Sequence, residues 1–135
     1  MEDKSAPVGQ GWEGLRKDYE TFRFGDEALL KILQMKYLSD KTGAGFILVE
    51  LSPYPSALTI DSFKKQYIEL KEELNRFCAE NKITHVDLSD DLLREEYFRK
   101  TDAIHLSDQG VRVTMELLAR QPEILEVFKN KPDHN

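Results

Sequence analysis

The feature that most constrains the fold is a short apolar run enclosed by residues that break regular structure. The run Phe46-Ile47-Leu48-Val49 follows Gly45 and precedes two prolines, Pro53 and Pro55. A run that is apolar at every position predicts a strand buried on both faces, as strands of parallel sheets are. It is far shorter than the roughly 20 residues that a membrane-spanning helix requires. We therefore expect a buried strand over residues 45–51.

A long amphipathic helix and a second short strand follow this run. Helical spacing of apolar residues predicts a helix from about 60 to 81, and residues 83–88 have the pattern of a strand. Strand, helix and strand form a βαβ unit, whose connection is nearly always right-handed and whose strands are parallel. The fold class predicted is α/β. Ligands of such sheets bind at the carboxyl edge, which draws attention to the loops at 52–59 and 89–107.

The remaining chain is predicted to add helices on either side of this unit. Asp26 is positioned to cap a helix whose apolar residues have helical spacing, and Gly43 follows its end. Ser107 marks the start of a last long helix that reaches Arg120. Three segments are expected: an N-terminal arm at 1–22, an α/β domain at 23–128 and a frayed tail at 129–135. The arm is expected to be disordered over 1–10 and weakly helical over 12–22. The domain is expected to end in a short helix at 122–128. The apolar residues of the helix after Asp26 are Leu29, Leu30, Leu33, Tyr37 and Leu38.

Composition excludes several classes of function. The net charge is −6, which disfavours a surface for nucleic acid or anionic lipid because phosphate binding needs clustered cations. Cys78 is the single cysteine, so neither an intrachain disulfide nor a cysteine-based zinc site is expected. The first residues are polar and show no secretory signal, and no membrane span is predicted. These features describe an acidic globular chain.

Asp102 and His105 are the residues most suited to chemistry. They lie three residues apart in a loop that follows the second predicted strand and precedes the last helix. A catalytic histidine needs a carboxylate on its Nδ1–H to fix the tautomer and to stabilise the imidazolium. Its Nε2 can then act as a general base toward a hydroxyl nucleophile. The alternative is that both residues only cap the last helix.

The residues around this pair resemble a known family. The string Asp-x-x-His-Leu-Ser-x-x-Gly, residues 102–110, resembles the last conserved block of the SGNH (GDSL-like) hydrolases. The order of elements over residues 44–120 is compatible with that family. The resemblance implies a three-layer, flavodoxin-like α/β fold, or a partial version of it. It also implies a Ser-His-Asp triad in which Asp102 orients the imidazole and His105 is the base of an ester hydrolase or O-acyltransferase.

The nucleophile block of that family is missing. Gly25-Asp26 is followed by Glu27 where the family has serine, and no apolar strand precedes it. The simpler interpretation is that Asp26 caps a helix. Ser52 and Ser56 lie at the correct sheet edge but lack the strand–turn–helix elbow that exposes a nucleophile. We therefore expect the C-terminal half of such a domain, with at most trace activity on its own and a parent enzyme that is active. The alternative is a non-catalytic α/β module for binding or assembly.

The expected partners follow from this interpretation. They are a small-molecule or polymer-linked ester substrate and no nucleic acid, and some relatives with this layout are anchored in the cell envelope. Two strands alone leave residues 46–49 poorly covered, which predicts exposed apolar surface, self-association or a missing N-terminal half.

No cofactor or metal is expected. His85 is interpreted as a packed or edge histidine in the second predicted strand. The acidic residues after it have no calcium-loop spacing and are interpreted as a solvated surface. These acidic residues are Asp87, Asp90, Asp91, Glu95 and Glu96.

Overall fold

A computed structural model describes residues 10–23 and 25–129. Residues 1–9 of the expected disordered segment, and residues 130–135 of the expected tail, lie outside this part. The elements are α1 (Gln10–Thr21), α2 (Glu27–Thr42), β1 (Ile47–Glu50), the 3₁₀ helix η1 (Pro55–Thr59), α3 (Asp61–Glu80), β2 (Thr84–Asp87), the 3₁₀ helix η2 (Glu95–Tyr97), α4 (Asp108–Ala119) and α5 (Pro122–Lys129).

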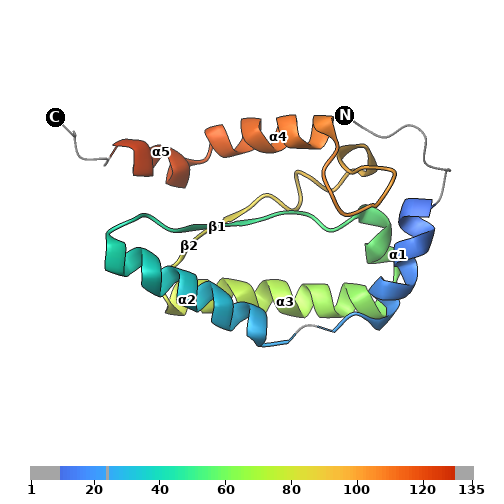
Figure 1. The fold of residues 1–135 in the computed structure, drawn as a ribbon, viewed down its shortest axis with the longest axis horizontal. Coiled ribbons are helices and arrows are strands. Elements are labelled where there is room, and N and C mark those ends of the chain that lie inside the picture. Colours follow the sequence, from blue (N-terminus) through green and yellow to red (C-terminus); the bar gives the residue numbers. More distant parts are fainter. Residues whose placement is uncertain (1–9, 24, 130–135) are drawn as a thin grey trace.

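The two predicted strands pair in parallel and α3 connects them. Ile47 aligns with Thr84 and Glu50 with Asp87, so both strands end at the same edge of the sheet. Figure 1 shows α2 and α3 on one side of the strands and α4 and α5 on the other. The mixed helix and strand content and the parallel strand pair confirm the predicted βαβ unit, with each strand shorter than expected by a residue or two at each end.

Apolar side chains pack on both faces of the strand pair because successive strand residues point to opposite sides. Ile47 and Val49 pack with Val86 and α4 in one cluster, whereas Phe46 and Leu48 pack with α3 in the other. The buried members of the first cluster are Val86, Leu88, Leu92, Tyr97 and Phe98. Those of the second are Leu74, Cys78 and Ile83. The strand pair therefore lies between two apolar layers.

The apolar residues of α2 do not share one face. Leu29 and Ile32 pack against the second cluster. In contrast, Leu30 and Tyr37 are 57% and 59% exposed. At 100° per residue, Leu30 and Tyr37 lie on the side of the helix opposite Ile32, so one sheet cannot cover them all. The Asp26 side chain makes no capping hydrogen bond, contrary to the prediction, whereas Gly43 ends the helix at φ 73° as predicted.

The start of α4 has the predicted cap. Ser107 Oγ accepts the backbone N–H of Gly110 at 3.1 Å and donates to the Glu96 carbonyl at 2.7 Å. The first turn of α4 packs closely against η2, since a Cβ atom on Gly110 would lie 2.1 Å from the Tyr97 carbonyl oxygen. This contact fixes the loop before α4 against η2.

Candidate active site

The loop that carries Asp102 and His105 is held as a closed hairpin. Phe98 and Leu106 form an antiparallel bridge, and the Arg99 N–H donates to the His105 carbonyl at 2.8 Å. The Ser107 N–H donates to the Tyr97 carbonyl at 2.8 Å. The two ends of the hairpin are thus tied together just before α4 begins, which fixes the backbone on which His105 lies.

The turn of this hairpin has an unusual backbone conformation. Ala103 has φ 53° and is buried, and its N–H donates to the Arg99 carbonyl at 3.0 Å. A non-glycine residue in the left-handed region is uncommon and needs surrounding structure to hold it. α1 supplies part of that structure, because a Cβ atom on Gly11 would lie 2.2 Å from the Lys100 carbonyl oxygen.

Asp102 and His105 are brought together as the sequence predicts. The Nδ1 of His105 lies 2.7 Å from Oδ2 of Asp102. The other carboxylate oxygen, Oδ1, accepts the backbone N–H groups of Ile104 at 2.9 Å and His105 at 3.0 Å. Three donors therefore fix the carboxylate, and the carboxylate in turn orients the ring. The alternative prediction is that Asp102 and His105 only cap α4. The residue that caps α4 is Ser107, so that prediction does not describe this arrangement.

The same hydrogen bonds set the charge state of the carboxylate. Partial burial of Asp102 opposes its ionisation, but the backbone N–H groups of Ile104 and His105 and the imidazole outweigh it and lower the pKa of Asp102 below its usual range. Asp102 is therefore an anion under ordinary conditions. An anionic partner on Nδ1 favours the ring form that carries its proton there and leaves Nε2 able to accept one.

The opposite ring edge faces outward. The His105 side chain is 69% exposed, and no described residue hydrogen bonds to its Nε2. The structure does not bring the candidate serines to it. Ser52 is buried and donates to the Pro53 carbonyl at 2.7 Å, and Ser56 donates to Glu95 Oε1 at 2.7 Å. Within the described residues, the pair has a base and its orienting carboxylate but no partner hydroxyl.

A cavity of about 360 Å³ lies beside the hairpin at the carboxyl edge. It mixes two aromatic rings with carboxylate, ammonium and amide groups, and His105 is not part of its wall. The lining residues are Tyr54, Glu95, Glu96, Phe98, Lys100 and Gln109. Both loops singled out in the sequence contribute to it. A polar molecule held here would lie next to residues 98–100, which lead into the Asp102–His105 turn.

A second polar cluster, which sequence reasoning missed, lies where the strands end. Lys71 Nζ on α3 donates to Glu50 Oε1 at 2.9 Å, Asp87 Oδ2 at 2.8 Å and Ser89 Oγ at 2.6 Å. His85 Nε2 lies 3.0 Å from Glu50 Oε2, with its side chain only 10% exposed, so it is a packed histidine as predicted. The sequence signal for this cluster is that Glu50 and Asp87 are charged residues at the ends of two strands that pair.

The charges of this cluster support one another. Burial opposes the charge on Lys71, but hydrogen bonds to Asp87 and Glu50 outweigh it and raise the pKa of the ammonium. Burial likewise opposes the charge on Asp87, and its bonds to Lys71 and Ser89 lower the pKa of the carboxyl. The Lys71 ammonium also lies 5.3 Å from the centre of the Tyr67 ring. The cluster joins α3 to both strands, which is a structural role.

Comparison with known proteins adds no relative: no protein family, no curated protein and no solved structure matches the chain. In the described ranges, no three or more His, Cys, Asp or Glu side chains are grouped so as to hold a metal ion. No helix of the same ranges is long and apolar enough to cross a membrane.

Proposed function

We propose that this chain carries the Asp and His of an SGNH-type serine ester hydrolase or O-acyltransferase. The observation that carries the proposal is the 2.7 Å contact between His105 Nδ1 and Asp102 Oδ2, in a hairpin that follows β2 and leads into α4. The motif at residues 102–110 and the parallel βαβ unit support the same assignment. The three-layer architecture of that family belongs to this proposal, with the helices on both sides of β1 and β2 as its support.

The roles follow from general acid–base chemistry. His105 Nε2 takes the proton of a serine hydroxyl as the oxygen attacks the ester carbonyl, and Asp102 stabilises the imidazolium that forms. The imidazolium returns the proton to the departing alcohol, which leaves an acyl-serine. Water completes a hydrolysis, whereas an alcohol acceptor completes an acyl transfer, with His105 again as the base. The substrate is a small-molecule or polymer-linked ester, as in a cell-envelope polymer.

In this proposal the nucleophilic serine and the oxyanion-hole donors do not belong to residues 102–110, the block that resembles the family. Ser52 and Ser56 are engaged by other groups, and neither reaches the imidazole. The proposal therefore assigns the nucleophile to another segment of the parent protein or to a partner chain. On its own this chain has at most trace activity, because a base without a nucleophile and an oxyanion hole has little to act on.

A second candidate is a non-catalytic α/β module that acts in binding or assembly. The exposed imidazole without a hydroxyl partner, within the described residues, favours it, and so does the exposed apolar face of α2. In this account the Asp102–His105 pair only stabilises the turn.

A fluorophosphonate probe separates the two candidates, since it reacts with serines that a neighbouring base activates. The native gene product that contains this chain should react, and peptide mass spectrometry should place the label on one serine. We expect that serine to lie outside residues 102–110. A native protein that takes up no probe under conditions that label a known serine esterase would leave only the non-catalytic module.

A further inference from the structure

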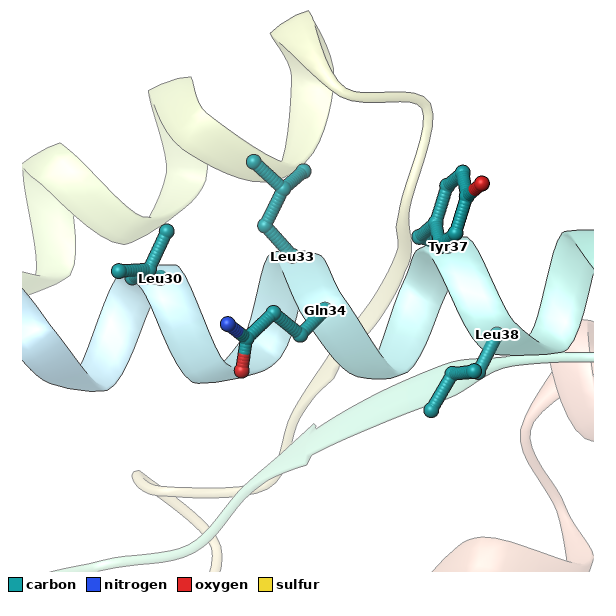
Figure 2. A pocket seen from close by; sticks show the side chains of 5 residues that line it. All are labelled: Leu30, Leu33, Gln34, Tyr37 and Leu38. Atoms are coloured by element: carbon teal, nitrogen blue, oxygen red, sulfur yellow. The ribbon is translucent and has the colours of Figure 1, made fainter.

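The outward face of α2 is an apolar groove with a polar centre. Leu30, Leu33, Tyr37 and Leu38 line it, and Gln34 lies between them (Figure 2). The groove is open to solvent and has a volume of about 470 Å³. Leu30 and Leu38 are 57% and 60% exposed, and they lie one turn to either side of Gln34. Large apolar side chains gathered in this way on one side of a helix are typical of an interaction surface.

The outward face of α2 carries opposite charges at the two ends of the helix. Glu27 lies at the start of the helix and Lys41 at its end, and both fall on the same outward stripe as Gln34. Each lies seven residues from Gln34, so the stripe is acidic on one side of its centre and basic on the other. Within one chain Glu27 pairs with Lys31 at 3.4 Å, and Lys41 lies over the Tyr37 ring. Lys31 is a further charge on this side of α2, and it lies beside Gln34 and Leu38 at the edge of the groove.

This arrangement fits a second copy of the same helix that runs in the opposite direction. A two-fold axis at Gln34 places residue i of one copy opposite residue 68 − i of the other. Leu30 then faces Leu38 of the second copy, and Glu27 faces its Lys41. Lys31 faces Tyr37 of the second copy. The same surface is complementary to itself, which is the requirement for a two-fold interface.

Gln34 gives the axis a defined position. Its amide carries both donors and an acceptor, so two copies of Gln34 on a two-fold axis can bond to each other. A single polar residue in an apolar helix interface fixes register and orientation at some cost in affinity. Antiparallel packing also places the positive end of each helix dipole beside the negative end of its neighbour.

We propose that this chain forms an antiparallel homodimer through the outward face of α2, centred on Gln34. A helix of 16 residues is about 24 Å long, so the contact is smaller than a standard stable interface. The dimer is therefore a weak one that forms at micromolar concentration. It covers the apolar residues of the groove, which the fold leaves exposed, and it does not depend on the proposed catalytic role.

Charge reversals test the two-fold register. The variants Glu27→Lys and Lys41→Glu each place like charges opposite one another twice in a dimer, and each should weaken self-association roughly tenfold. The double variant carrying both changes should recover it. A mixture of the two single variants should form a heterodimer, since each then supplies the charge that the other lacks. Sedimentation equilibrium measures all four, with Glu72→Lys on the exposed surface of α3 as a control.

Leu38→Glu tests the apolar part of the interface and should lower the association constant at least 100-fold. Helix content from circular dichroism should stay unchanged, because Leu38 is exposed in the single chain. The proposed dimer forms at micromolar concentration, so a wild-type chain that stays monomeric at about 200 µM would overturn the proposal. Single variants that fail to associate when mixed would overturn the register, and with it the two-fold pairing.

Discussion

His105→Ala is expected to slow fluorophosphonate labelling of the native protein by about 10³-fold. The probe is attacked by a serine oxygen only as fast as its proton is removed, and His105 is the group that removes it in the proposed site. Asp102→Ala should slow labelling by about 100-fold, because the ring remains but loses the carboxylate 2.7 Å from its Nδ1. The measurement is the initial rate of label incorporation at one fixed probe concentration.

Two comparisons make this result specific. Asp91→Ala removes an exposed carboxylate from the same stretch of chain and should label at the wild-type rate. His105 is 69% exposed, so its replacement should leave thermal unfolding nearly unchanged, which separates loss of the base from loss of the fold. Labelling of His105→Ala at the wild-type rate would show that the imidazole takes no part in activating a serine.

Gly110→Ala is expected to lower the free energy of unfolding by about 3 kcal/mol. The new methyl group would lie 2.1 Å from the Tyr97 carbonyl oxygen, which is backbone and cannot turn away. Relief requires α4 to move away from η2, which breaks the 2.8 Å bond from the Ser107 N–H to the Tyr97 carbonyl. Urea unfolding followed by circular dichroism measures the change.

Gly14→Ala is the matched control for this substitution. Gly14 lies inside α1, and beyond its chain neighbours and the adjacent backbone of the helix no atom lies within 4 Å of the position a Cβ would take. Alanine is a better helix former there, so this variant should be as stable as wild type or more stable by up to about 1 kcal/mol. Equal stability of Gly110→Ala and wild type would show that α4 does not pack on η2 as described.

Local patterns account for the parts of the structure that could be predicted. The apolar run at 46–49 identified β1, and Ser107 identified the start of α4, because both depend on neighbours in the chain. The approach of Asp102 to His105 is of the same kind, since one turn of backbone separates them. The family resemblance of residues 102–110 assigned roles to these two residues, and it remains a prediction.

Contacts between distant segments could not be predicted. Lys71 meets Glu50 and Asp87 only after α3 packs across both strands, and nothing in the helix pattern distinguishes it from the solvated lysines nearby. The division of α2 between a packed face and an exposed face depends on the number of strands available to cover it. For the same reason the sequence indicated Ser56 at the correct sheet edge but not its bond to Glu95, which lies 39 residues further along the chain.

The central claim is that Asp102 holds His105 with the proton on Nδ1 and with Nε2 free to act as a base. Two-bond ¹H–¹⁵N correlation spectra of the chain, at a pH where its imidazoles are neutral, identify the protonated nitrogen of each ring. His105 should carry its proton on Nδ1, and His85, which faces Glu50 through Nε2, should carry it on Nε2 as an internal contrast. Asp102→Ala should return His105 to the Nε2–H form. A wild-type His105 already in the Nε2–H form would contradict the account.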